Sequence, residues 1–462
     1  VKSLEDLKKV IVDGNLAKLP QMGEKKVDNI RRGIEIYEQS RARLSIYEAM
    51  NITNEVVEYM KKLPQLIEIE PAGSLRRWRE TVGDIDVLIS SQNGLKVVDH
   101  FVKYPRVIRV LAKGDTKGSV VVEGGRQVDI RIVKQKSFGS ALQYFTGSKA
   151  HNIKLRDIAK ARGLKLNEYG LFQITRKGEK KIAGKNEGDI YKALGLSYIP
   201  PELREDRGEI ELAQKGKLPD LIKLEDIKGD LQVHSTYSDG SASLKAIAQY
   251  GRGLGYKYIL ISDHSQSAKY AHGLNKERFL KELEEIEMIN KKISSITLLK
   301  GIEVDILANG ELDFSDELLR KTDIVVAAIH SGFKKNVTER MLDAMQNPYV
   351  DIIAHPIGRL ISSREGYEVD ILKIMEAARK LKVWLEVNAF YDRLDLNDIN
   401  LKRAKEMGIM ITIDTDAHGL DGLHWMKFGV AQARRGWIEK NDVVNTNPWE
   451  VIAKMRRRNR HR

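Results

Sequence analysis

The chain has 462 residues and no cysteine, with 78 lysine and arginine residues against 65 aspartate and glutamate residues, a formal net charge of +13. Its length predicts two to four domains, and the lack of cysteine excludes disulfides and thiolate metal sites. The basic excess favours a polyanionic partner. No apolar run approaches the roughly 20 residues of a membrane span, and the opening "VKSLEDLKKV" has no apolar signal region. We therefore expect a cytoplasmic protein with no membrane association.

The apolar pattern changes its period several times along the chain. Residues 1–60 carry apolar side chains at three- and four-residue intervals, which predicts helices. Residues 66–133 contain short strands rich in Val and Ile, and residues 138–195 return to helices and short turns. Residues 198–229 contain a Pro-Pro pair and little periodicity, which predicts a connection between domains. From residue 230 onward apolar strands alternate with helices, as in an α/β barrel or a doubly wound sheet.

Three aspartates lie in the strand-rich part of the chain. Asp84 and Asp86 are two residues apart in "GDIDVLI", so both carboxylates point to one face of a strand, and Asp129 lies in the later strand "RQVDIRIV". Like charges this close repel, and a cation relieves that repulsion. Three facing carboxylates can hold two Mg²⁺ ions about 3.5–4 Å apart, the arrangement of in-line phosphoryl transfer. A solvated strand face would explain the first pair alone; the Gly73-Ser74 turn, whose N–H groups can approach a phosphate, favours function.

The motifs "GSLRR", "GDIDVLI", "VDIRIV" and "YFTGSKAHNIKLR" occur in this order within about residues 1–205. Together they resemble the core of family X DNA polymerases, the polymerase beta group. The resemblance implies a nucleotidyltransferase palm flanked by helical subdomains that bind DNA and select the nucleotide. It assigns both metal ions to Asp84 and Asp86, and the catalytic metal beside the primer 3′-hydroxyl to Asp129. Gln127 departs from the pattern, because polymerase beta has an arginine at this place.

The same resemblance assigns the incoming nucleotide and nascent pair to eight residues: Gly73, Ser74, Arg77, Tyr144, Phe145, Gly147, Asn152 and Arg156. Ser74 and Arg77 correspond to triphosphate contacts, and the aromatic pair corresponds to residues that pack on the sugar. Judged from the residues alone, Tyr144 and Phe145 are also explained as core aromatics at a helix end. Asn152 and Arg156 are likewise explained as an exposed pair one helical turn apart.

Residues 19–30, "LPQMGEKKVDNI", resemble a helix-hairpin-helix motif. Backbone N–H groups at such a helix start bind a DNA phosphate without reading sequence, and Gly23, Lys25 and Lys26 are the predicted DNA contacts. A plain helical turn explains the segment equally well. From this start of the sequence we expect the 8-kDa N-terminal domain usual in the family to be missing or truncated, and therefore no lyase activity of the kind that it houses.

Five of the ten histidines close apolar strands after residue 230, at positions His234, His264, His330, His355 and His418. The carboxylates Asp239, Asp263, Glu303 and Asp416 accompany them. One histidine at a strand end is usually a polar cap, but five in one domain are difficult to attribute to chance. In a closed parallel barrel the C-terminal strand ends converge on one mouth. Imidazole and carboxylate ligands suit Zn²⁺, Mn²⁺ or Fe²⁺, and clustered ions of this kind activate water and hold a phosphoryl group.

These strand ends, over about residues 228–440, resemble the PHP domain of the polymerase and histidinol phosphatase superfamily. The resemblance implies a distorted (β/α)7 barrel with up to three metal ions, Zn²⁺ or Mn²⁺. It transfers the ligand role to eight residues: His234, Asp239, His264, Glu303, His330, His355, Asp416 and His418. Gln232 replaces the first histidine of the family's H-x-H, and a neutral amide oxygen is a poor ligand for a transition metal. Arg359 is a candidate phosphate contact or a surface arginine.

The sequence thus predicts a multidomain protein of the α/β and α+β classes. The predicted parts are a helical DNA-binding subdomain (1–60), a palm (61–135), a nucleotide-selecting subdomain (136–200), a linker (201–227) and a PHP phosphoesterase domain (228–462). We expect a monomeric DNA-directed DNA polymerase that fills gaps in DNA repair, using gapped or primer-template DNA, dNTPs and Mg²⁺ or Mn²⁺. The PHP domain is predicted to be a metal-dependent 3′-5′ exonuclease or phosphoesterase. The alternatives are a PHP domain reduced to a structural scaffold and a small-molecule phosphatase.

Overall fold

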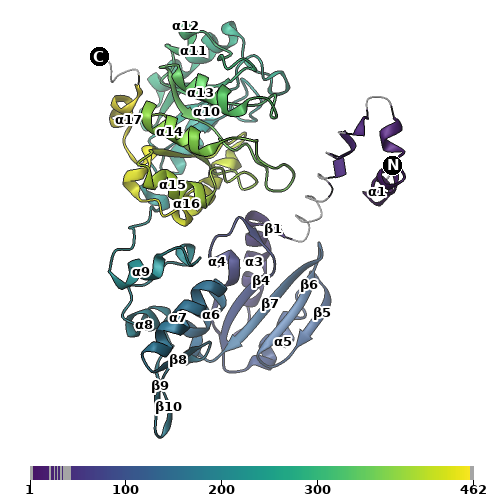
Figure 1. Cartoon of the computed structure of the whole chain (residues 1–462), viewed down its shortest axis with the longest axis vertical. Helices are drawn as coiled ribbons and strands as arrows, with labels where there is room; N and C mark the ends of the chain where they lie inside the picture. The colour runs from purple at the N-terminus through teal and green to yellow at the C-terminus, as the bar shows by residue number, and fades with distance from the viewer. Residues whose placement is uncertain are drawn as a thin grey trace. The chain divides into compact units, whose positions relative to one another are not determined.

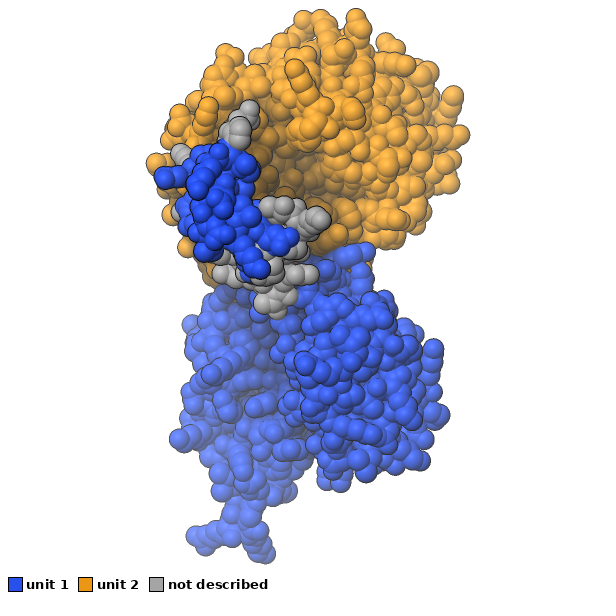
Figure 2. All heavy atoms as spheres, turned by 90° about the vertical axis from the view of Figure 1, so that its right-hand side faces the viewer, with its two compact units in different colours: residues 1–218 blue, residues 219–462 orange. Residues whose placement is uncertain are grey.

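The computed structural model describes residues 4–19, 22–24, 26–28, 30–31, 34 and 43–457. The chain divides into two compact units, Val1–Leu218 and Pro219–Arg462, which have separate colours in Figure 2. Lys25, one of the predicted DNA contacts, lies outside the described residues. Within the described ranges no helix is long and apolar enough to cross a membrane.

The start of unit 1 contains α1 (Leu4–Val12) and the short 3-10 helix η1 (Leu16–Lys18). Ile11, Leu16, Val27 and Ile34 form a small apolar cluster of their own. Gly23 and Lys26 are exposed, and the N–H of Lys26 donates to the carbonyl of Gly23 at 2.8 Å, closing one turn. The predicted DNA contacts that are described therefore lie on the surface of a helical segment.

A five-stranded mixed sheet forms the centre of unit 1, with strand order β2-β4-β7-β6-β5 (Figure 1). Its strands are β2 (Leu66–Pro71), β4 (Ile85–Ser91), β5 (Val107–Lys113), β6 (Lys117–Val122) and β7 (Arg126–Val133). A two-stranded sheet, β1 (Leu44–Ser45) with β3 (Thr81–Val82), lies beside α3 (Ile46–Met60), and the single turn α4 (Gly73–Arg76) leads from β2 toward β4.

The two faces of this sheet have different chemistry because side chains alternate along a strand. Ile85, Val87 and Ile89 are fully buried on one face, as the alternation predicts. Helix α5 (Gly94–Phe101) covers the same face, where Gly118 leaves room for Phe101 and Val98. The opposite face carries Asp84 and Asp86 at one end, and further along Leu88 packs against α6 (Phe138–Thr146). One end of that face is therefore left for polar chemistry.

The rest of unit 1 follows the sheet. It contains η2 (Gln135–Ser137), α7 (Lys149–Ala161), β8 (Leu164–Asn167), β9 (Gly170–Thr175), β10 (Gly178–Ala183), α8 (Glu187–Ala193), η3 (Pro201–Leu203) and α9 (Glu209–Gln214). A buried ion pair joins Arg204 to Glu187, which also accepts from Arg76. Buried Glu209 accepts from His151 of α7 at 2.7 Å. Residues 201–218 thus pack into unit 1. Along the chain, the boundary between the two units lies between Leu218 and Pro219, inside the segment 201–227 where a linker was expected.

Unit 2 is a barrel of seven parallel strands in sequential order. They are β11 (Gly229–Val233), β12 (Tyr258–Ile261), β13 (Thr297–Asp305), β14 (Ile324–Ala328), β15 (Val350–Ile353), β16 (Trp384–Asn388) and β17 (Ile411–Asp414). The outer helices are α10 (Leu244–Gly253), α11 (Lys276–Lys292), α12 (Asp316–Leu319), α13 (Val337–Gln346), α14 (Ile371–Leu381), α15 (Asp398–Glu406) and α16 (Met426–Arg435), with α17 (Trp449–Met455) at the end of the chain. Short 3-10 helices are η4 (Leu224–Asp226), η5 (Lys269–Ala271), η6 (Leu420–Trp425), η7 (Lys440–Asp442) and η8 (Val444–Thr446). The predicted (β/α)7 architecture is confirmed.

The barrel closes where the first strand meets the last. Val233 pairs with Ala417 in parallel, and the N–H of His234 donates to the carbonyl of Ala417 at 2.9 Å. Side chains at the strand starts, such as Tyr258 and Ile324, belong to an apolar cluster that Ile452 of α17 joins. One end of the barrel is therefore filled with apolar side chains, and the polar strand ends gather at the other.

Candidate active sites

The first site lies at the end of the unit 1 sheet where β4 and β7 run side by side. Asp86 and Asp129 are direct partners across this parallel pair. Gly73 has φ +61°, and a Cβ there would lie 2.4 Å from Oδ2 of Asp86, so only glycine lets the turn approach the carboxylate. Burial, and then the charges of Asp129 and Asp84, raise the pKa of Asp86 to about 6. This carboxyl group holds a proton more readily than an ordinary aspartate, as expected of a site built to share negative charge with a cation.

The Asp129 carboxylate is fixed by side chains of β6 and β7. It accepts hydrogen bonds from the Ser119 hydroxyl and from Nε2 of Gln127, the latter at 3.0 Å, and Nζ of Lys117 lies 3.6 Å away. Gln127, which departs from the polymerase beta pattern, therefore still contacts this aspartate. Its neutral amide orients the carboxylate without adding the positive charge that an arginine would bring.

A cavity of about 510 Å³ opens beside Asp84 and Asp86, and it is lined by Arg43, Ser74, Arg77, Arg79, Gly83, Asp84, Asp86 and Glu205. Nε of Arg77 donates to Glu205 at 3.1 Å, and its Nη1 donates to the carbonyl of Thr146. The cavity thus presents arginines beside two aspartates, a combination suited to an anion held next to a metal ion.

The predicted nucleotide contacts cluster in part around the end of α6. The rings of Tyr144 and Phe145 meet edge to face with centroids 5.2 Å apart. Asn152 donates to the carbonyl of Tyr144 at 2.7 Å, so it lies against this pair. Gly147 has φ +72°, and a Cβ there would lie 3.0 Å from Nη1 of Arg77. Arg156 is exposed on α7 and contacts only the carbonyl of Asn152 among the hydrogen bonds of the described residues.

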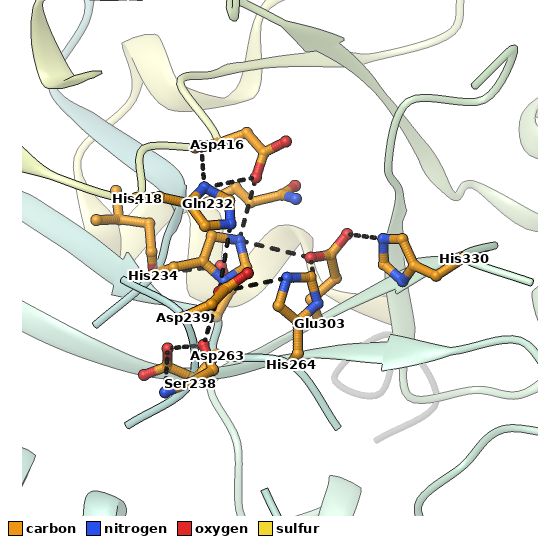
Figure 3. A network of polar contacts seen from close by, with 12 residues as sticks. Gln232, His234, Ser238, Asp239, Asp263, His264, Glu303, His330, Asp416 and His418 are labelled. Atoms are coloured by element: carbon orange, nitrogen blue, oxygen red, sulfur yellow. Dashed lines mark hydrogen bonds and ion pairs between the residues drawn. The ribbon is translucent and has the colours of Figure 1, made fainter. Parts of the chain in front are cut away.

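The second site lies at the mouth of the barrel, where all eight predicted donors come together. Figure 3 labels each of them except His355. Glu303 of β13 is central. Its Oε2 lies 3.2 Å from Nδ1 of His264 and 3.5 Å from Nε2 of His234, and its Oε1 lies 3.2 Å from His355 and 3.4 Å from His330. The two remaining carboxylates, Asp239 and Asp416, extend this network.

Asp416 and Asp239 complete the cluster around the last strand. Nε2 of His234 lies 3.1 Å from Oδ1 of Asp416. Oδ1 of Asp239 lies 3.4 Å from Nε2 of His418 and 3.7 Å from Nε2 of His264. The loop that carries Asp239 turns back tightly, since a Cβ on Gly240 would lie 2.4 Å from the carbonyl oxygen of His234.

The electrostatics of the mouth favour ligand-competent protonation states at Glu303, His264 and His355, but not at His330. Burial opposes ionisation of Glu303, but the charges of His330 and His264 hold its pKa well below the ordinary value. Burial lowers the pKa of His264 and of His355 to about 4, which keeps these imidazoles neutral at neutral pH. Glu303 raises the pKa of His330 to about 10 against the effect of burial, so a divalent ion would have to displace the proton of this histidine.

The donor set fits divalent metal ions. Three groups have ligand atoms within 4.8 Å of one another, and Glu303 belongs to two of them: His234, Asp239, His264 and His418; His264, Glu303 and His330; His234, Glu303 and Asp416. Buried atoms of His234, His264 and Glu303 make no hydrogen bond with described residues, which is unfavourable unless an ion satisfies them. Among the described residues such groups occur in unit 2 alone, and the three aspartates of unit 1 do not form one.

Gln232 lies inside this network rather than apart from it (Figure 3). It is fully buried, and neither its amide oxygen nor its amide nitrogen has a hydrogen-bond partner among the described residues. Gln232 lies two residues before His234, so alternation along the strand puts both side chains on the same face. The amide therefore faces the cluster as an unsatisfied polar group.

Two contributors to the mouth have no clear signal in the sequence. Asp305 accepts from Nδ1 of His330 at 2.5 Å and so fixes the orientation of that imidazole. Arg393 has 16% of its side chain exposed, its Nε lies 3.6 Å from Oδ2 of Asp416, and its buried Nη1 has no hydrogen-bond partner among the described residues. Arg359, the sequence candidate for a phosphate contact, instead donates to the backbone carbonyls of Arg393 and Leu394.

Asp263, which follows β12, holds the loop that carries Asp239. It accepts from the hydroxyl groups of Ser235 and Ser238, and its Oδ1 accepts from the N–H of Ser235 at 2.8 Å. Behind it, burial and the adjacent Asp263 carboxylate raise the pKa of Glu282 well above the ordinary value. Glu282 therefore stays protonated in the folded protein at pH values where an unfolded glutamate is ionised.

We expect Glu282→Gln to stabilise unit 2 at alkaline pH. A carboxyl group whose pKa is raised on folding stabilises the fold below its unfolded pKa of 4.5, and this contribution is lost as pH rises toward the folded value. The variant should gain on the order of 1 kcal/mol or more at pH 8 and much less at pH 5. Urea unfolding at both pH values measures this, with Glu284→Gln on the exposed side of α11 as control. Equal effects at the two pH values would contradict the assignment.

Comparison with known proteins agrees with both parts of the chain. Residues 43–122 match the family model of the DNA polymerase beta palm, residues 141–205 that of the DNA polymerase beta thumb, and residues 230–389 that of the PHP domain. The chain is 40% identical to the DNA polymerase/3'-5' exonuclease PolX of Bacillus subtilis (strain 168), over 99% of this chain and 81% of that protein. It is also 31% identical to a probable phosphatase of Thermoanaerobacter sp. (strain X514), over 36% of this chain and 71% of that protein.

The similarity to the Bacillus subtilis protein covers nearly all of the chain, and the palm, thumb and PHP models match in the order that the sequence predicts. Polymerase and PHP domains of these kinds depend on metal ions. The chain therefore belongs to the PolX family of family X DNA polymerases, with a polymerase beta palm and thumb followed by a PHP domain.

Proposed function

We propose that this protein extends DNA primers in unit 1 and removes nucleotides from DNA 3′ ends in unit 2. The observation that supports it most strongly is that two separate carboxylate-rich sites, one beside arginines and one among histidines, occur in a member of the PolX family. Gapped or primer-template DNA and dNTPs are the proposed substrates, with gap filling in DNA repair as the biological role.

For the polymerase site we propose that Asp84, Asp86 and Asp129 hold Mg²⁺, the ion that carboxylate oxygens and phosphates favour. Bound ions there align the primer hydroxyl with the nucleotide and offset the developing charge. Ser74 and Arg77 bind the triphosphate, and Tyr144 and Phe145 pack against the sugar. Glu205 and the Thr146 carbonyl hold the Arg77 side chain at the cavity before a nucleotide enters, which lowers the entropic cost of binding.

For the barrel site we propose Mn²⁺ or Zn²⁺ bound by the eight predicted donors, since imidazole and carboxylate ligands without thiolates suit these ions. Bound ions there lower the pKa of water and polarise the phosphodiester. Asp305 holds His330 in position, and Arg393, buried with a free Nη1 beside Asp416, binds a non-bridging phosphate oxygen. Arg359 holds the backbone of Arg393 and so sets the direction of that side chain.

One substrate set tests both activities in the full chain. A 5′-labelled primer in a one-nucleotide gap should lengthen by one residue with dNTPs and Mg²⁺, and a 5′-labelled single strand should shorten stepwise from its 3′ end with Mn²⁺ and no dNTP. EDTA should stop both reactions. No extension with dNTPs would refute the first proposal, and no shortening with Mn²⁺ or Zn²⁺ would refute the second and favour a scaffold role for the barrel.

We expect Gln232→His to increase metal occupancy at the barrel mouth. The amide of Gln232 is buried and unsatisfied, and an imidazole there supplies a donor of the type that the other strand ends provide. Mn²⁺ should bind the variant about tenfold more tightly or more, as measured by calorimetry with metal content from mass spectrometry. Gln266→His, two residues after His264, is a control outside the cluster. Unchanged affinity and stoichiometry would show that the existing ligand set is complete without position 232.

A further inference from the structure

Tyr270 lies next to the candidate metal ligands at the barrel mouth, on a loop whose backbone is held by several hydrogen bonds. The loop runs from Ser265 to Leu274, directly after β12 and His264. Its ends are joined, because the N–H of Leu274 donates to the carbonyl of His264 at 2.7 Å. A Cβ on Gly273 would lie 1.9 Å from the carbonyl oxygen of Ser265, so the loop crosses itself closely at this glycine.

Side chains from neighbouring elements hold the same loop. Ser267 donates through its N–H to Asp313 at 2.7 Å and through its hydroxyl to Asp305 at 2.6 Å, the carboxylate that also orients His330. Nη1 of Arg278 donates to the carbonyl of His272 at 2.7 Å. The loop is therefore anchored to β13, to the segment that follows β13, and to α11.

Tyr270 is an exposed aromatic residue of this anchored loop. Ala268 and Ala271 on either side are buried, but 66% of Tyr270 is exposed. Its hydroxyl has no hydrogen bond among the described residues. A large aromatic surface that is held out by a fixed backbone loses little conformational entropy when a ligand covers it.

The Tyr270 ring lies beside the candidate ligands. Its centroid is 6.2 Å from that of His264 and 6.2 Å from that of His330, with interplanar angles of 55° and 70°. Because the ring stacks flat on neither imidazole, its face stays available to a ligand at the mouth. A nucleobase is separated from its phosphate by one sugar, a span comparable with these ring separations.

We propose that Tyr270 is a stacking platform for the nucleobase of the 3′-terminal nucleotide while its phosphodiester lies at the barrel mouth. The proposal rests on the 3′-end hydrolysis proposed above and names the part of the substrate that this loop recognises. Stacking of a base on an aromatic side chain is sequence-tolerant, because every base has a π face. The platform therefore favours a terminal base that is unpaired and free to leave the duplex stack.

The test is a double-mutant cycle with the full chain, in which the tyrosine ring and the terminal base are each removed, alone and together, and KM is measured. Wild type and Tyr270→Leu are compared on two single-stranded oligonucleotides with Mn²⁺, one with a normal 3′-terminal nucleotide and one whose terminal residue is abasic. Removing the ring should raise KM on the normal strand roughly tenfold and leave KM on the abasic strand unchanged. The ratio of the two KM values cancels any loss of folded or metal-loaded protein.

Two further variants narrow the interpretation. Tyr270→Phe keeps the ring and should behave as wild type on both strands. Tyr169→Ala removes a tyrosine that is 58% exposed in the β8–β9 turn of unit 1, and it should also behave as wild type. If Tyr270→Leu changes KM equally on both strands, or on neither, the platform is refuted although 3′-end hydrolysis stands. If wild type shortens neither strand, the proposed hydrolysis has failed and the platform with it.

Discussion

Replacing Asp86 with asparagine should reduce primer extension by about 10²–10³-fold or more while hydrolysis at the barrel mouth continues at the wild-type rate. Asp86 lies between Asp84 and Asp129, its direct partner across β4 and β7, and the resemblance to polymerase beta gives it a role toward both ions. A neutral amide cannot supply the charge that two divalent ions require.

The fold should survive this change. The pKa of Asp86 is raised to about 6 by burial and by its two acidic neighbours, so the ionised form is disfavoured when no ion is bound, and asparagine removes that repulsion. Thermal unfolding should show a midpoint equal to or above that of wild type. Asp157→Asn on the exposed surface of α7 is the matched control and should extend normally. Extension by Asp86→Asn near the wild-type rate would refute the assignment of this site.

The second large effect is expected from Glu303→Gln, which should abolish 3′-end hydrolysis and leave primer extension intact. Glu303 lies within 3.5 Å of four imidazoles, and its ligand atoms belong to two of the three metal-type groups. Loss of this one carboxylate removes a donor from both groups. It also leaves His330 without the charge that raises its pKa most.

Metal analysis should show the same loss directly. Glu303→Gln should retain at least one ion fewer per chain than wild type after dialysis against Mn²⁺, while Glu317→Gln, an exposed glutamate on α12, should retain the wild-type number. Hydrolysis that persists in Glu303→Gln with full metal content would show that the reaction occurs elsewhere in the chain.

The sequence was sufficient for the architecture because its periodicity is strong. Apolar strands alternating with helices predicted an α/β barrel or a doubly wound sheet, the resemblance to the PHP domain implied the barrel, and the seven strands and their order follow it. The alternation in "DIDVLI" predicted which side chains are buried, and Ile85, Val87 and Ile89 are. The resemblance to the PHP domain assigned the eight donors, and the strand ends explain why they lie together, since parallel strands of a barrel bring those ends to one mouth.

The remaining features depend on contacts that spacing along the chain does not encode. Arg393 lies in a loop after β16, and its direction follows from Arg359 binding the backbone there. Asp305 directly follows the core residue Val304 in β13, and its role comes from its contact with His330, which lies just after β14. Gln232 was visible as a departure from H-x-H, but the lack of a hydrogen-bond partner for its buried amide depends on the surrounding described residues. Lys25 and its neighbours remain predictions.

The central claim is that one chain carries two independent metal-dependent sites. It is tested most directly by comparing the two single variants, their combination and their mixture on one labelled gapped duplex. Asp86→Asn, Glu303→Gln, the double variant and an equal mixture of the single variants are each given Mg²⁺ with dNTPs, then Mn²⁺ alone. If the two sites are independent, each single variant loses one activity, the mixture shows both, and the double variant shows neither. Loss of both activities in either single variant, or hydrolysis by the double variant, would contradict it.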